Sequence, residues 1–295
     1  MIAAVAYANP WRYQANPEVY LLVAFLVGAF IYSVRVIGPG AVEPGEPVVT
    51  RRHIWCFVGA MVLLFFASTW PIHQIGEEYL YSMHMLQHMM LSYFMPPLVL
   101  LATPEWLLRI IIGNGRMYRV LRFASKPVFA GVLFNGVIAV THIPGVVDYS
   151  VGSAPVHYTL HFVLVMAALL MWMPVVGPFK ELHMGYAGKM IYLFLQGVLP
   201  TIPAGWLTFA DGAVYTVYNQ PVRVWGLSVT ADQQIAGGIM KVGGTLFVWS
   251  IVVYMFFHRF APGWQDDSGY RRTGDKANGI PTAFPPKPQS PAPQH

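Results

Sequence analysis

The stretch that decides the fold is residues 156–175, VHYTLHFVLVMAALLMWMPV, which contains no Asp, Glu, Lys or Arg. A helix needs about 20 mostly apolar residues to cross about 30 Å of hydrocarbon. Runs of this kind recur along the chain, and they predict an all-α membrane protein, a bundle of seven transmembrane helices. The predicted spans are residues 18–37, 53–71, 80–101, 127–142, 156–175, 188–209 and 233–257.

The composition agrees with a membrane protein and excludes several other classes. Of the 295 residues, 56% are hydrophobic and 11% are charged, whereas about a quarter of a soluble protein is charged. The net charge is +5, but the basic residues are scattered between apolar runs, which argues against a nucleic-acid partner. The single cysteine, Cys56, excludes an internal disulfide and a multi-thiolate metal site.

The basic residues predict how the spans are oriented. Fifteen of the eighteen Lys and Arg residues lie in alternate connections or the C-terminal tail, and the opposite connections hold only Arg12 and Arg223. Short loops rich in Lys and Arg stay in the cytoplasm. We therefore expect the N-terminus outside and the C-terminus in the cytoplasm.

The organisation of the chain follows from these spans. Residues 1–17 lack the basic start and long apolar stretch of a cleavable signal, so we expect a short periplasmic tail. Residues 18–260 form the predicted transmembrane domain. Residues 261–295 are rich in Pro, Gly and charged residues, a composition typical of a disordered tail, which we expect in the cytoplasm.

Two histidine pairs with the same spacing are the strongest functional pattern. His84 and His88 are four residues apart, as are His157 and His161, so each pair shares one helix face. Both spans are predicted to start outside, and the rise of 1.5 Å per residue puts both pairs in the outer leaflet, with His84 and His88 roughly 6 and 12 Å deep. The four imidazoles are therefore predicted to converge on one metal ion.

Further groups are expected on the same side. His142, at the end of residues 127–142, is a candidate exchange ligand. Asp148 and Asp232 are candidate carboxylates that accept hydrogen bonds from the imidazoles and orient the rings. The alternative interpretation is that these membrane histidines only form hydrogen bonds between helices.

The nature of the ligands favours copper. Met83, Met85, Met89 and Met90 flank the first pair, and imidazole with thioether favours copper, especially Cu(I). Methionines also fill irregular helix interfaces, and we interpret this stripe as packing first. Zinc remains an alternative. Haem is a second one, although histidines four apart are too close to ligate opposite sides of one macrocycle; a single haem held by one histidine from each helix stays open.

Several motifs, in order, resemble those of one family. They are residues 84–89 with Pro96, Pro97 and Leu98; residues 141–144 with Asp148; residues 157–161; residues 171–174 with Gly177 and Pro178; Tyr215 and Tyr218; and residues 232–240. This series, which covers the second to the seventh span, is similar to the CtaG family of assembly factors for caa3-type cytochrome c oxidase. Lys241, in the last span, departs from the aromatic residue expected there; it is interpreted as a hydrogen-bonding residue.

The resemblance implies a multi-pass protein of the bacterial inner membrane that helps to mature a haem-copper oxidase. We expect it to bind copper, to deliver it to oxidase subunits, and to contact membrane lipid. One alternative function is a metal-ion or proton transporter, which the apolar inner halves of residues 80–101 and 156–175 disfavour. Another is a haem-binding or histidine-cluster oxidoreductase. Because no nucleophile motif is recognisable, we expect no enzymatic activity.

Overall fold

The computed structural model describes residues 9–274, with side chains up to residue 259. The chain divides into two compact units, residues 1–252 and 253–295, and each is described by itself. The described residues form helices and loops, with no strand among residues 9–274. The predicted all-helical class is therefore confirmed.

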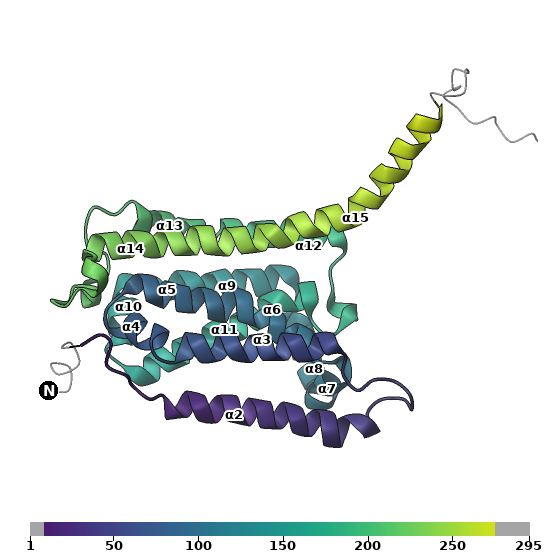
Figure 1. Cartoon of the computed structure of the whole chain (residues 1–295), viewed down its shortest axis with the longest axis horizontal. Helices are drawn as coiled ribbons and strands as arrows, with labels where there is room; N and C mark the ends of the chain where they lie inside the picture. The colour runs from purple at the N-terminus through teal and green to yellow at the C-terminus, as the bar shows by residue number, and fades with distance from the viewer. Residues whose placement is uncertain (1–8, 275–295) are drawn as a thin grey trace, which may run out of the picture. The chain divides into compact units, whose positions relative to one another are not determined.

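The helices are named here as Figure 1 labels them. They are α2 (Pro17–Tyr32), α3 (Arg51–Ser68), α4 (Ile72–Glu78), α5 (Tyr81–Met89), α6 (Met95–Ala102), α7 (Glu105–Ile112), α8 (Arg116–Ala124), α9 (Pro127–Thr141), α10 (Pro144–Val151), α11 (Ala154–Val176), α12 (Tyr186–Val198), α13 (Thr201–Thr208), α14 (Val229–Gly238) and α15 (Gly244–Gly274).

Six helical segments are long and apolar enough to cross a membrane. They are Pro17–Gly40, Arg51–Glu78, Tyr81–Ala102, Ala154–Val176, Tyr186–Thr208 and Val229–Arg259. A seventh span requires α8 and α9 to act as one, although they are bent by 72°. The 15 residues of α9 cover only about 22 Å. The structure thus has the character of a multi-pass membrane protein with six or seven candidate spans.

Three candidate spans contain a break in their α-helical geometry. One-turn π-helical segments occur at Ser33–Ile37, Met90–Phe94 and Ile239–Gly243, and such segments often mark functional sites. The second of these ends before Pro96 and Pro97, which lack the N–H that a regular helix needs. Pro200 separates α12 from α13, which agrees with the break expected from a proline inside a span.

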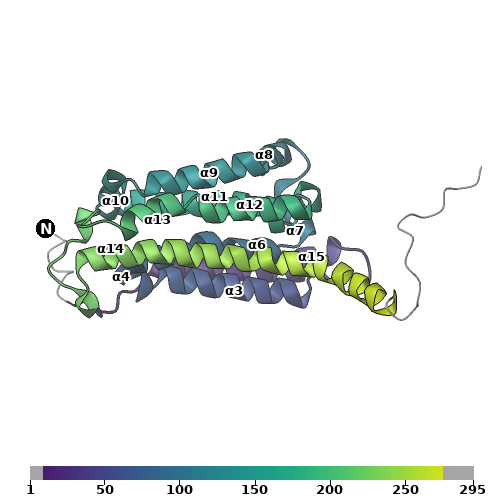
Figure 2. The same ribbon diagram turned by 90° about the horizontal axis from the view of Figure 1, so that it is seen from above.

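The helix that carries the first histidine pair lies at the centre of the first unit. The Tyr81–Ala102 segment has the most buried apolar window of the candidate spans, at 67%, whereas the Pro17–Gly40 window is 6% buried. In Figures 1 and 2, α2 runs beside α3 at the edge of the bundle. The α5 histidines are therefore surrounded by protein.

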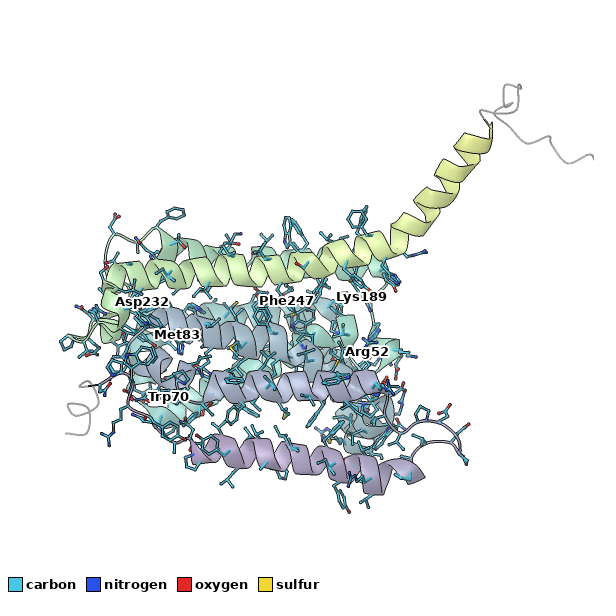
Figure 3. All side chains as sticks on the ribbon, viewed as in Figure 1. Arg52, Trp70, Met83, Lys189, Asp232 and Phe247 are labelled. Carbon is cyan, nitrogen blue, oxygen red and sulfur yellow. The ribbon has the colours of Figure 1, made fainter. Side chains whose placement is uncertain are left out.

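The two ends of this bundle differ in character. In Figures 1 and 2, α4, α10 and the start of α14 lie at one end, and α7 and α8 lie at the other. We call the first the histidine end, formed by α4, α10 and the starts of α5, α11 and α14. The second is the basic end, formed by α7, α8 and residues 177–189. Figure 3 places Trp70 and Asp232 at the histidine end and Arg52 and Lys189 at the basic end.

The C-terminal boundary differs from the prediction. Helix α15 runs to Gly274, so residues 261–274 are helical where a disordered tail was expected. Extending an existing helix needs no new nucleus and is far less costly than starting one. The remainder of the expected tail, residues 275–295, and the first eight residues lie outside the residues described.

Candidate metal centre

Helix α5 presents His84 and His88 on one buried face, as their spacing predicts. Their side chains are nearly inaccessible, and their ring centroids lie 4.4 Å apart. The start of α5 is held by Asp232, whose carboxylate accepts the backbone N–H groups of Tyr81 at 2.8 Å and Ser82 at 3.0 Å. A helix leaves its first N–H groups unpaired, so this carboxylate fixes where the histidine face begins.

Helix α11 brings the second pair against the first. The ring centroids of His157 and His161 are 4.3 Å apart, and each ring lies 5.6 Å from that of His84. Pro155 occupies the first turn of α11, where its missing N–H costs nothing. The predicted convergence of the four imidazoles is therefore present in the structure.

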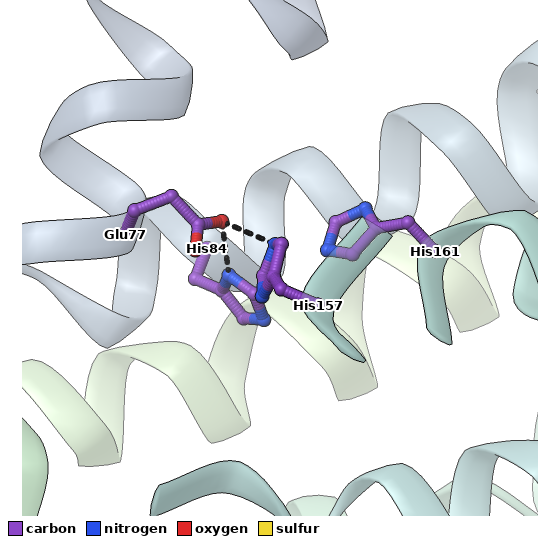
Figure 4. A group of neighbouring side chains, drawn as sticks. All are labelled: Glu77, His84, His157 and His161. Atoms are coloured by element: carbon purple, nitrogen blue, oxygen red, sulfur yellow. Dashed lines mark hydrogen bonds and ion pairs between the residues drawn. The ribbon is translucent and has the colours of Figure 1, made fainter. Parts of the chain in front are cut away.

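A carboxylate joins these rings. Glu77, near the end of α4, has its Oε1 atom 2.8 Å from Nε2 of His157 and 3.3 Å from Nδ1 of His84 (Figure 4). The 2.8 Å contact with His157 is an ion pair that does not have the geometry of a hydrogen bond. One carboxylate oxygen thus lies beside two imidazoles from different helices.

Glu77, His84, His157 and His161 together could hold a metal ion. One ligand atom from each lies within 4.8 Å of the other three. In a tetrahedral site with bonds of about 2.0 Å, ligand atoms are about 3.3 Å apart, so small side-chain rotations bring the four atoms into range. Three imidazoles and a carboxylate suit zinc or copper better than calcium or magnesium, which bind through oxygen.

The rings also show where a ligand is needed. Ten buried side-chain nitrogen or oxygen atoms of the described residues have no hydrogen-bond partner, and four of them are imidazole Nε2 atoms, those of His88, His142, His157 and His161. Buried polar groups are nearly always paired, and leaving one unpaired costs about 1–3 kcal/mol. Four of one kind in one region fit a site for a cation.

His142 lies beside the first histidine pair, one step further along it. Its ring centroid is 6.3 Å from that of His88, and it belongs to the C-terminal end of α9. The structure therefore places the five histidines predicted as ligands in one continuous series. Only two members of that series, His88 and His142, lie outside the four-residue cluster around Glu77.

The two aspartates that were predicted to orient imidazoles have other partners in the structure. Asp148 accepts the hydroxyl of Thr216 at 2.9 Å and the backbone N–H of Val217 at 3.3 Å. Asp232 accepts the backbone of α5, as described above. Among the described contacts neither carboxylate meets an imidazole. They were expected to orient rings because a carboxylate near a histidine commonly does so; that role stays a prediction, since the hydrogen-bond partners of both are backbone N–H groups and, for Asp148, also a hydroxyl.

Glu77 was missed as a ligand by the sequence analysis. It lies next to Glu78, and an acid between two apolar runs is a recognisable signal of function. His73, on the same helix, is another ionisable residue between the two apolar runs. Its Nδ1 atom lies 3.8 Å from Oε1 of Glu77 and accepts a hydrogen bond from the side-chain amide of Gln87 at 3.1 Å. Helix α4 thus supplies the carboxylate that completes the four ligands.

Tyrosines lie beside this cluster. Tyr81, Tyr215 and Tyr218 are each at most 1% exposed, and the ring of Tyr81 lies 4.4 Å from that of Tyr215. The hydroxyl of Tyr218 donates to the carbonyl of Gly76 at 3.0 Å, and that of Tyr215 to the carbonyl of His142 at 3.0 Å. Burial raises the pKa of Tyr215 to about 12 and raises that of Tyr218 as well, so both hydroxyls remain protonated donors.

Lys241 contacts neither the cluster around Glu77 nor the pair His88 and His142 in the described contacts. Its ammonium donates to the hydroxyl of Thr201 on α13 at 2.6 Å, and its side chain is exposed on the surface of the described unit. The contact agrees with the hydrogen-bonding role expected for this residue. The long lysine side chain reaches a neighbouring helix from outside.

Comparison with known proteins gives one family and two relatives. The family described as cytochrome c oxidase caa3 assembly factor (Caa3_CtaG) matches residues 23–261. The uncharacterized proteins Mb0105 of Mycobacterium bovis and MT0111 of Mycobacterium tuberculosis are each 29% identical over 196 residues, which are 60% of this chain. The match spans only 29% of the length of either relative. No solved structure matches.

Proposed function

The chain belongs to the caa3-type cytochrome c oxidase assembly factor family, and from this premise we propose that it binds copper at the Glu77 cluster and helps to deliver it to a haem-copper oxidase. Its partners are then oxidase subunits, and its place is the bacterial inner membrane. In this proposal it carries the ion as cargo and catalyses no reaction.

The observation that carries this proposal is the set of four partnerless imidazole Nε2 atoms beside a carboxylate. Neutral imidazole binds metal through a free lone pair. A carboxylate inside an apolar bundle is costly unless a cation pairs with it. The negative charge of Glu77 balances one positive charge, so Cu(I) leaves the centre neutral whereas a divalent ion leaves it charged.

The orientation proposed with this function puts the histidine end outside. The basic end carries five cations, on α7, on α8 and just before α9, and such residues favour the cytoplasm; they are Arg109, Arg116, Arg119, Arg122 and Lys126. The cluster around Glu77 then lies near the periplasmic surface. This is where an ion arriving from outside the cell would meet the protein first.

Metal analysis of the purified full-length protein tests the proposal. Copper should be retained by the wild type, and the copper content per chain should fall when His84 and His157 are both replaced by Ala. A His183→Ala variant serves as the matched control, because His183 lies at the basic end and contacts Gly177 and Lys189. Equal retention in the wild type and the double variant would defeat the proposal.

Two further measurements address the alternative functions. In cells, loss of the protein should lower the copper content of the oxidase, and the double variant should not restore it. In proteoliposomes, a carrier of this kind should give no copper flux, whereas a transporter would. The purified protein should show no Soret absorption band, since haem is not the proposed ligand.

A further inference from the structure

A small cavity lies one helical turn further along the histidine face than the Glu77 cluster. Its volume is about 10 Å³, and the side chains of His88, His142, Met85, Met89 and Met240 line it. Four residues separate His84 from His88, which corresponds to about 6 Å along a helix. The cavity is therefore distinct from the cluster around Glu77, although the ring of His88 contacts both His84 and His161.

One of the two histidines in the cavity wall, His142, is held in the form that binds a metal. Nδ1 of His142 lies 2.7 Å from the carbonyl oxygen of Ile138. A carbonyl only accepts hydrogen bonds, so Nδ1 carries the proton and Nε2 has a free lone pair. A metal-binding histidine characteristically donates its other N–H to a carbonyl in this manner. Nε2 of His142 and Nε2 of His88 are both buried without a partner.

The other donors in the wall are sulfur atoms. Met85, Met89 and Met240 are at most 6% exposed. The two hydroxyl groups of the wall are already engaged, since Ser92 donates to the carbonyl of His88 at 2.6 Å and Tyr93 to that of Gln196 at 3.4 Å. What remains for a guest is two imidazole nitrogens and three thioethers, a set with no negative charge.

The backbone around the cavity is irregular on three sides. Met240 belongs to the π-helical segment Ile239–Gly243, Ser92 and Tyr93 to the segment Met90–Phe94, and Pro200 to the break between α12 and α13. None of these features occurs in a regular α-helix. π-Helical turns are frequent at functional sites. Three separate helices thus depart from regular geometry around one small space.

We propose that His88, His142, Met85, Met89 and Met240 form a second metal site, selective for Cu(I), next to the Glu77 cluster. Thioether and imidazole together favour Cu(I) over zinc and over Cu(II). Because the set is uncharged, a monovalent ion also leaves the smallest charge buried in the bundle. The Glu77 cluster, with its carboxylate, accepts harder ions as well, so the two sites differ in selectivity.

This inference deepens the proposed function and rests on it for one point only, that the ion is cargo. The ring centroids of His161 and His88 lie 4.9 Å apart, so an ion released by the first cluster has an imidazole of the second site beside it. Oxidised copper would stay at the first cluster, and only reduced copper would be accepted further in.

The test compares Cu(I) and zinc on the purified full-length protein under anaerobic, reducing conditions. The wild type should bind two Cu(I) ions and one zinc ion per chain. Replacing Met85, Met89 and Met240 together by Leu should remove one Cu(I) and leave zinc binding unchanged. Leucine conserves volume and is well tolerated in cores. The matched control replaces Met95, Met171 and Met173, which are equally buried and outside the cavity.

Two results would overturn the second site. One is an unchanged Cu(I) count in the Met85/Met89/Met240 variant, which would leave a bridging water as the occupant of the cavity. The other is an X-ray absorption spectrum of the copper-loaded wild type with no sulfur neighbour. A Glu77→Gln, His157→Ala variant separates the two proposals. This variant should lose zinc and keep one Cu(I). If the wild type instead bound no zinc and a single sulfur-ligated Cu(I), the proposed site at the Glu77 cluster would be wrong and the second site would stand.

Discussion

The two ends of the bundle treat their polar side chains in opposite ways. At the basic end, Arg109 donates to Glu105 at 2.7 Å and to Glu181 at 2.9 Å, and Lys189 donates to the carbonyl of Val175 at 2.6 Å. At the histidine end, buried imidazoles lie close together, and four of them have an Nε2 atom without a hydrogen-bond partner. Charged residues paired within the chain stabilise the structure, whereas a group of buried imidazoles without hydrogen-bond partners marks a site for a ligand.

The largest effect that tests this contrast is the loss of one carboxylate. Glu77→Gln keeps the shape of the side chain but removes the charge that balances a bound cation. We expect the affinity for copper and zinc to fall by more than the roughly 10- to 100-fold that the loss of an outer hydrogen-bond partner costs. Metal competition with a chromophoric chelator measures this change.

The control is a carboxylate at the other end. Glu181→Gln removes an exposed partner of Arg109 and should leave both affinities unchanged. If the two variants lost metal equally, the distinction between the ends would be wrong.

A second prediction concerns Asp232, which is fully buried. Asp232→Ala removes the acceptor of two backbone N–H groups at the start of α5. Each buried donor left unpaired costs about 1–3 kcal/mol, so we expect a loss of roughly 2–4 kcal/mol in the free energy of unfolding. Denaturant titration of the metal-free protein in detergent measures it.

Asp232→Asn sharpens this prediction because it retains one acceptor oxygen. Its loss of stability should be about half as large. An effect on metal affinity without an effect on stability would instead restore the role first expected for Asp232, that of orienting an imidazole.

A smaller effect is expected from the tyrosines beside the cluster. Tyr218→Phe removes the hydrogen bond to the carbonyl of Gly76. Gly76 directly precedes Glu77 in the sequence. The expected cost is about 1 kcal/mol, together with faster release of metal, because α4 is then held less firmly. Stopped-flow transfer of metal to a chelator gives the rate. Tyr149→Phe, at an exposed tyrosine, is the control and should change neither quantity.

The parts of the site that the sequence predicted are those governed by local geometry. His84 and His88, or His157 and His161, share a face because of the helical repeat alone, and their common depth follows from the direction of the two spans. The direction of the spans and the count of seven stay predictions. The helical class followed from apolar run length, which requires no knowledge of packing.

The parts that were missed depend on tertiary packing. Glu77 reaches the rings only because α4 is a separate short helix that packs against α5. The partners of Asp148 and Asp232 are loop and helix-start N–H groups from distant parts of the sequence. No periodicity within a span encodes such contacts. The cavity beside His88 likewise needs Met240, from the π-helical segment Ile239–Gly243 that packs beside α5, although Met85 and Met89 were visible as neighbours of the histidines.

The smallest expected effect is a pH dependence at the basic end. Burial lowers the pKa of His183 below its usual 6.5, and the positive charge of Lys189, whose ammonium lies 3.4 Å from Nδ1, lowers it further, whereas the hydrogen bond from Nε2 to the carbonyl of Gly177 acts in the opposite direction. Protonation of Nδ1 would remove that acceptor and place two cations together. A histidine whose pKa is lowered by folding contributes stability that is complete above its unfolded value of about 6.5 and declines as the pH falls below it.

We therefore expect the melting temperature of the metal-free wild type to drop between about pH 8 and about pH 5.5, on either side of the usual histidine pKa. His183→Gln cannot be protonated and should show a smaller drop, and the difference between the two chains isolates this residue. A larger drop in the variant would mean that His183 is more readily protonated in the folded protein. The polar groups of the basic end would then not be paired within the chain, and the contrast between the two ends would be wrong.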